Sequence, residues 1–108
     1  MELKKLQSDR KRIVKVSVSK EDGEVEFLDL AIWHKPLTPA LADEIDAIEG
    51  EKMERLTRQL ELILTRWDLT DGGAEVKPTQ ASMNGFEFEF LHAIRDAIFE
   101  RVYPKKAT

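Results

Sequence analysis

The sequence has 108 residues, of which 35% are charged, with a formal net charge of −4 and no cysteine. A chain of this length suits a single domain with a modest core, and the lack of cysteine excludes disulfides, thiolate metal sites and thiol nucleophiles. It contains no run of about 18 apolar residues that could cross a membrane, and its charged first twelve residues lack the apolar stretch of a secretory signal.

Positive charge is concentrated near the N-terminus. Residues 1–20 carry seven lysines or arginines and two acids, whereas the remainder carries ten basic residues and nineteen acids. We predict a flexible basic arm at 1–12, a single domain at 13–103 and a tail at 104–108. A basic arm can contact nucleic acid, which leaves a small nucleic-acid-associated regulator as one alternative. A nucleic-acid partner is not favoured, because the arm has no aromatic residue to stack on bases and the body is acidic.

The first regular element predicted is a β-hairpin. Val14, Val16 and Val18 alternate with polar residues, which is the period of a half-buried strand. Asp22-Gly23 follows and suits a two-residue turn, because both central positions tolerate positive φ. We expect a strand on each side of this turn.

The return strand is predicted from Glu24 to about Trp33. Its apolar residues change parity at Phe27-Leu28, which predicts a bulge or a strand covered on both faces. A lone hairpin is marginal in water, so it must pack on the helices or pair with another chain.

Two amphipathic helices are predicted next. Thr38-Pro39 has the form of an N-cap followed by the first helical residue, and Leu41, Ile45 and Ile48 give this helix one apolar stripe. The second helix is expected to organise the core and to end at Trp67, because its large apolar residues recur in steps of three and four. They are Met53, Leu56, Leu60, Ile63 and Trp67, widened by Leu64.

The rest of the chain is predicted as a polar loop at 68–78, one helical turn after Pro78-Thr79 that Asn84-Gly85 stops, and a last helix from near Phe86. The fold class is therefore α+β, an N-terminal β-hairpin packed on about three main α-helices. The predicted structural core is Leu56, Leu60, Ile63, Trp67, Ile94 and Ile98.

No constellation of residues indicates catalysis, a metal or a cofactor. Asp68, Asp71 and Glu75 lie near two glycines, but their spacing does not fit a calcium loop, and aspartates commonly form local turns. His34 and His92 lack the histidine partner that a helix-borne zinc site shows. We therefore expect a non-enzymatic protein.

The aromatic residues point instead to a protein partner. Phe86, Phe88 and Phe90 are spaced by two, so on a helix they cannot all face one core, and Phe88 is the one expected to be exposed. The predicted partner-binding residues are Trp33, Phe88, Phe99 and Tyr103. The alternative is that a small domain uses all of these residues internally.

The order of elements resembles a known family. A hairpin is followed by Lys35-Pro36-Leu37-Thr38-Pro39, an acidic helix, the string Glu61 to Gly73 with its Trp-Asp-Leu-Thr-Asp exit, Pro78-Thr79 and a closing amphipathic helix. Over residues 13–103 this resembles small tail assembly chaperones and related tail proteins of long-tailed bacteriophages and prophages. The basic arm and the run from Phe86 to Phe90 depart from that pattern.

The resemblance implies a cytoplasmic protein of the bacterial host that binds the tape measure protein or the tail tube protein before tail polymerisation. A small acidic protein with apolar helix stripes can cover the apolar faces of a helical partner and keep the complex soluble. A structural tail-completion protein or an oligomeric adaptor, in which the hairpin edge makes rings, is the alternative within this class.

Overall fold

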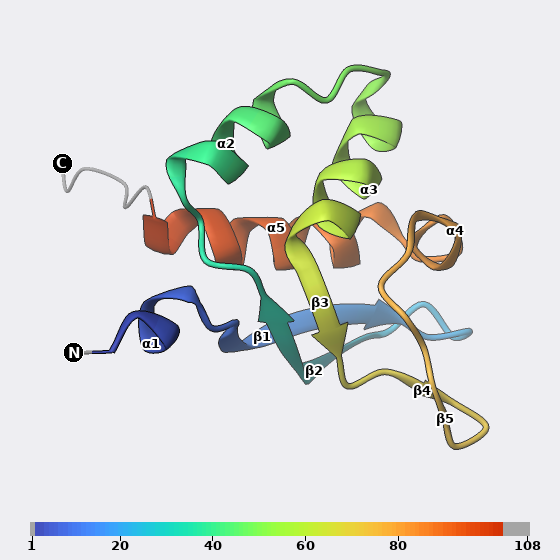
Figure 1. The fold of residues 1–108 in the computed structure, drawn as a ribbon. Coiled ribbons are helices and arrows are strands. Elements are labelled where there is room, and N and C mark those ends of the chain that lie inside the picture. The colour runs from blue at the N-terminus through green and yellow to red at the C-terminus, as the bar shows by residue number, and fades with distance from the viewer. Residues whose placement is uncertain (1, 103–108) are drawn as a thin grey trace, which may run out of the picture.

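The computed structural model describes residues 2–102 and has the predicted α+β fold (Figure 1). Tyr103 and the predicted tail lie outside the described residues. The helices are α1 (Leu3–Gln7), α2 (Pro39–Asp46), α3 (Lys52–Ile63), α4 (Gln80–Met83) and α5 (Phe88–Val102). The strands are β1 (Arg10–Ser19), β2 (Val25–His34), β3 (Leu64–Trp67), β4 (Thr70–Asp71) and β5 (Ala74–Glu75).

A three-stranded antiparallel sheet in the order β1-β2-β3 lies on one side of the molecule, and α2, α3 and α5 lie on the other (Figure 1). β1 and β2 pair in one continuous register from Arg10↔His34 to Ser19↔Val25. The bulge predicted at Phe27-Leu28 is therefore wrong. β1 also begins at Arg10, so the last three residues of the predicted arm belong to the sheet.

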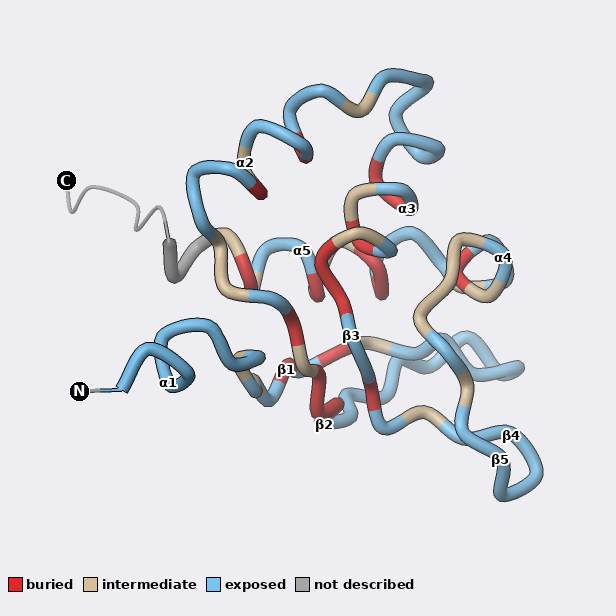
Figure 2. Tube along the Cα trace, in the orientation of Figure 1, coloured by how far each residue is buried: buried red, intermediate tan, exposed pale blue. Residues whose placement is uncertain are grey.

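The inner face of the sheet packs against the helices and is formed by even-numbered residues. Val14 and Val16 of β1 and Leu30 and Ile32 of β2 are buried there, because successive side chains of a strand point to opposite faces. Buried residues gather where this part of the sheet meets α3 and α5, whereas the far end of the hairpin is exposed (Figure 2).

The helix predicted to end at Trp67 ends instead at Ile63, and β3 follows it without a loop. The Ile63 carbonyl accepts a hydrogen bond from Lys35 N at 2.9 Å, and Asp68 N donates to the Ala31 carbonyl at 3.0 Å. Pairing with β2 thus supplies the backbone hydrogen bonds that another helical turn would have made. Tertiary contacts commonly override helix periodicity in this way.

A register shift opposite Trp33 and His34 explains why the helical spacing was misleading. Trp67 pairs with Ile32 and Leu64 pairs with His34, so β3 has one extra residue between the two pairs. Such a bulge changes the parity of a strand. Leu64 and Trp67 can therefore both face the core, although they are three residues apart.

Trp67 joins three parts of the fold although it lies on a strand. Its indole Nε1 donates to the Val76 carbonyl at 2.6 Å, and its ring meets those of Phe86 and Phe90 edge-on, with centroids at 5.7 and 6.5 Å. The segment predicted as a polar loop contains the β4–β5 hairpin, whose turn glycines Gly72 and Gly73 have φ of 58° and 86°. This hairpin returns the chain to the indole.

The core contains the residues that the sequence analysis selected. All six are buried: Leu56, Leu60, Ile63, Trp67, Ile94 and Ile98. Met53, which was placed on the same apolar stripe, is 38% exposed at the first turn of α3. The stripe thus begins to face the core only at Leu56.

We predict that Trp67→Ala lowers the free energy of unfolding by about 3–5 kcal/mol, because it removes a large, fully buried side chain. Urea denaturation followed by circular dichroism measures this change. Phe88→Ala is the matched control, since Phe88 is 55% exposed, and it should cost less than about 1 kcal/mol. A loss of similar size in the two variants would contradict the central role of Trp67.

Candidate protein-binding surface

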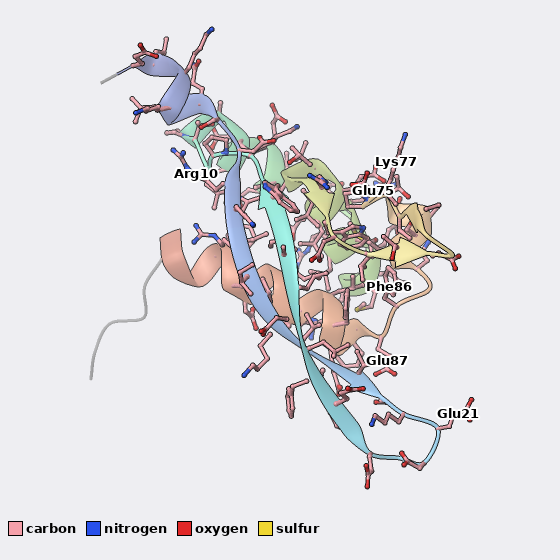
Figure 3. All side chains as sticks on the ribbon, turned by 90° about the horizontal axis from the view of Figure 1, so that it is seen from below. Arg10, Glu21, Glu75, Lys77, Phe86 and Glu87 are labelled. Atoms are coloured by element: carbon pink, nitrogen blue, oxygen red, sulfur yellow. The ribbon has the colours of Figure 1, made fainter. Side chains whose placement is uncertain are left out.

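The outer face of the sheet is open, because all three long helices lie on the inner side. Figure 3 views this face from below, with the two long strands in front of α5 and Glu21 at the end of the hairpin that projects beyond the helices. Nine large apolar side chains among the described residues are exposed, and five of them belong to this hairpin. The projecting hairpin is thus the main exposed apolar surface of the described chain.

Four of these residues form a cluster that we call the hairpin tip: Val18, Val25, Phe27 and Leu28. Val25 and Phe27 lie on the outer face of the sheet and are 54% and 65% exposed, while Val18 and Leu28 lie on the inner face. The hairpin therefore exposes apolar side chains on both of its faces in this region.

The inner side of the hairpin tip borders a hollow of about 280 Å³ next to the start of α5. Its lining residues come from β1, the β3–β4 connection and the segment that enters α5: Ser17, Val18, Leu69, Gly85, Phe86, Glu87 and Phe90. Ser19 Oγ donates to Glu87 Oε2 at 3.3 Å and links β1 to the segment before α5. The apolar side chains of the hairpin tip are exposed beside this contact.

Trp33, a predicted partner-binding residue, is half-buried on the outer face and lies between two cations. The Lys11 Nζ is 5.3 Å from its ring centroid and the Arg66 Cζ is 4.6 Å away. Arg66 Nε in turn donates to Glu75 Oε1 at 2.9 Å. These contacts cover part of the indole and hold it in place, so Trp33 offers a fixed aromatic surface rather than a free one.

The other predicted partner-binding residues are not gathered at one site. Phe88, at the start of α5, is exposed as expected and meets His92 edge-on at 5.5 Å. Phe99 is half-buried eleven residues further along α5, under Arg95. Tyr103 lies outside the described residues. Trp33 is on the opposite side of the sheet from α5, so the four residues do not form one continuous patch.

The sequence analysis missed the hairpin tip, although a signal was visible. Apolar residues of both parities at Val25, Phe27 and Leu28 were interpreted as a bulge or as a strand covered on both faces. They instead mark side chains that no other described element covers, with Val25 and Phe27 on the open outer face and Leu28 on the inner face. Alternation reports which face a residue occupies, but not whether another element covers that face.

His34 is buried at the other end of the hairpin and has a defined tautomer. Arg12 Nε donates to His34 Nε2 at 2.9 Å, so Nδ1 carries the proton and donates to the Lys35 carbonyl at 2.7 Å. Burial lowers the pKa of His34 below its ordinary value of 6.5, and the charges of Arg12 and Arg10 lower it further, against opposing effects of Lys35 and Asp9. The neutral imidazole is therefore structural.

The acidic residues Asp68, Asp71 and Glu75, whose spacing does not fit a calcium loop, have separate structural roles. Asp68 Oδ1 accepts from Ala31 N at 3.0 Å, Glu75 pairs with Arg66, and Asp71 belongs to β4. Within residues 2–102, no group of three or more histidine, aspartate or glutamate side chains is placed to hold a metal ion. Over the same range, no helix has the length and apolar character needed to span a bilayer.

Comparison with protein-family models, with curated proteins and with solved structures gives no match to this chain. The exposed surfaces and the sequence resemblance are therefore the observations that bear on its function.

We predict that His34 makes stability depend on pH. Between its lowered pKa and 6.5, the unfolded chain binds a proton that the folded protein does not. The free energy of unfolding is therefore greatest above about pH 6.5 and falls as the pH decreases, by at most about 1.4 kcal/mol per pH unit for one proton. Urea denaturation between pH 7.5 and 5 measures the slope.

The control for this prediction is a pair of variants. His34→Gln removes the titrating group, so the difference in unfolding free energy between wild type and this variant should shrink as the pH falls. His92→Gln keeps His34 and should retain the wild-type slope. An unchanged slope in His34→Gln would assign the pH dependence to other groups.

Proposed function

We propose that the protein is a non-enzymatic tail assembly chaperone of a long-tailed bacteriophage or prophage. It would bind the tape measure protein, the tail tube protein or both in the cytoplasm of the bacterial host before the tail polymerises. The resemblance over residues 13–103, with its Trp-Asp-Leu-Thr-Asp exit, supports the family. The exposed hairpin supports the mode of action, which is binding of another polypeptide.

The observation that carries the binding role is the apolar surface of the hairpin tip. Exposed apolar clusters on small proteins commonly mark interaction sites. The tip has apolar side chains on both faces, among them Phe27 at 65% and Leu28 at 46% exposure. A partner that covers these side chains removes them from water, which is worth roughly 1.5–3 kcal/mol for each large side chain fully buried.

The charge of the chain fits a chaperone that keeps its complex soluble. Acidic residues surround the hairpin tip in sequence at Glu21, Asp22, Glu24 and Glu26, and the chain as a whole has a net charge of −4. An apolar cluster bordered by like charges can bind an apolar segment of a partner, while the surrounding charges oppose association between copies of the complex.

An oligomeric adaptor is the second candidate, favoured by one feature of the sheet. β1 is an edge strand of ten residues, paired on one side with β2. An edge strand can pair with another chain, although exposed lysines such as Lys11 and Lys15 commonly discourage this. In a ring-forming tail-completion protein, the β1 edge would join neighbouring copies.

Co-expression with the tape measure protein of the same phage or prophage tests the proposal. We expect one complex on a sizing column and about a tenfold or greater loss of affinity in Ile13→Thr/Phe27→Thr, because both residues are more than 60% exposed apolar side chains. Threonine preserves strand propensity. Separate elution of the two wild-type proteins would contradict the chaperone role.

Lys15→Thr is the matched control for that double variant. Lys15 is exposed on the same outer face, opposite Asp29 and between the two substituted positions. Its replacement should leave the affinity within about twofold, as expected for a single exposed charge outside the apolar surface. An equal loss in the control variant would mean that charge, and not the apolar surface, governs binding.

Multi-angle light scattering distinguishes the second candidate. The chaperone role predicts a monomer of 12.4 kDa at every concentration in the absence of partner. A mass that increases in integral steps with concentration, and that Lys15→Pro on the free edge of β1 abolishes, would favour the ring-forming adaptor.

A further inference from the structure

A groove between the helices is lined by basic side chains, which the hairpin tip lacks. It consists of two hollows that meet at Gln59 and Arg95, which line both of them. The larger hollow, of about 410 Å³, is lined by Ala42, Ile45, Asp46, Gln59, Arg95 and Phe99. The smaller, of about 170 Å³, is lined by Lys52, Arg55, Leu56, Gln59, His92 and Arg95. We call the two together the interhelical groove.

The smaller hollow is basic although the chain is acidic. Three of its six lining residues are cations, one is a histidine and none is a carboxylate. Among the described residues, the side chains of Lys52 and Arg55 take part in none of the ion pairs: those pairs are Lys20–Glu26, Arg58–Glu54, Arg66–Glu75 and Arg95–Asp96. Lys52 and Arg55 thus have no ion-pair partner in the described part of the chain, whereas Arg95 already pairs with Asp96.

The larger hollow is mixed, with apolar side chains from α2 and α5 and one carboxylate, Asp46, at the end of α2. Ala42, Ile45 and the half-buried Phe99 line it. Arg95 spans the two hollows, with its guanidinium 5.4 Å from the Phe99 ring centroid and 3.5 Å from Asp96. The groove therefore offers apolar side chains beside one carboxylate in the larger hollow and, in the smaller one, two cations that are unpaired within residues 2–102.

The terminal segments of this sequence do not complement the groove. α1 exposes Leu3 and Leu6 but also carries Lys4 and Lys5, and residues 103–108 contain two lysines and no acidic residue. Like charge disfavours either segment next to Lys52 and Arg55. A complementary occupant must instead bring carboxylates beside apolar side chains.

We propose that the interhelical groove binds an acidic amphipathic helix of a partner protein. Apolar side chains on one turn of that helix fill the hollow beside Ile45 and Phe99, and carboxylates on the adjoining turn pair with Lys52, Arg55 and Arg95. Helices commonly dock in grooves in this way, through residues at i, i+3, i+4 and i+7. The inference rests on the proposed protein-binding role but uses a surface separate from the hairpin tip.

Fluorescence anisotropy with a labelled synthetic helix tests this proposal on the full chain. The probe carries leucines at i, i+3, i+4 and i+7 with glutamates on the adjoining turn, and a second probe has glutamine in place of every glutamate. The acidic probe should bind at least about fivefold more tightly, given two or more exposed ion pairs, and added salt should reduce this preference. Equal affinity for the two probes would overturn the proposal.

Variants locate the binding. Lys52→Gln/Arg55→Gln should lower the affinity for the acidic probe by about fivefold or more. Arg58→Gln is the matched control on the same helix, because Arg58 already pairs with Glu54 at 3.1 Å, and it should leave the affinity unchanged. Unchanged affinity in the double variant, or displacement of the probe by inorganic phosphate at equal ionic strength, would rule out a helix-specific groove.

The outcome is separable from that of the proposed function. If the tape measure complex forms but neither it nor the acidic probe depends on Lys52 and Arg55, the chaperone role stands and the groove proposal fails. If the acidic probe binds in a Lys52- and Arg55-dependent manner while no tape measure complex forms, the groove proposal stands and the partner is another protein.

Discussion

The buried indole of Trp67 is the contact on which the rest of the structure depends. One hydrogen bond, from Nε1 to the Val76 carbonyl, ties the end of β3 to the chain that leaves the β4–β5 hairpin. The same ring packs edge-on against Phe86 and Phe90, which stack on each other at the entrance to α5. Sheet, hairpin and closing helix thus meet at one side chain, and the Trp-Asp-Leu-Thr-Asp string has a structural explanation.

The position of that side chain depends on a one-residue bulge, which limits what periodicity could predict. The apolar spacing correctly identified the buried face of α3 and every residue of the predicted core. It could not distinguish a fourth helical turn from a strand, because the bulge in β3 lets Leu64 and Trp67 share a face as they would on a helix. The choice is made by unpaired backbone groups of β2, which are distant in sequence and contribute nothing to a local pattern.

The exposed surface was less predictable than the core for a related reason. Phe88 could be predicted to be exposed because three aromatics spaced by two cannot share one helix face. The hairpin tip could not, since an apolar residue on a strand has the same alternation whether a helix covers it or the strand runs beyond the helices. Coverage depends on the relative lengths of hairpin and helical layer. Here the Ser19–Glu87 hydrogen bond still links the hairpin to the segment before α5, yet Phe27 and Leu28, which pair with Ser17 and Val16, are exposed.

The distribution of charge gives the two proposed surfaces different selectivities. Acidic residues border the hairpin tip, so affinity there must come from apolar burial, and the bordering charges disfavour acidic partners. Lys52, Arg55 and Arg95 border the interhelical groove, so it favours the partners that the tip disfavours. A single long helical protein with apolar and acidic stretches could occupy both surfaces at once. Two weak contacts on one chain then act as a strong one, because the second contact forms at a high effective concentration. A chaperone benefits from this arrangement, since each contact remains weak enough to be released in turn when the partner assembles.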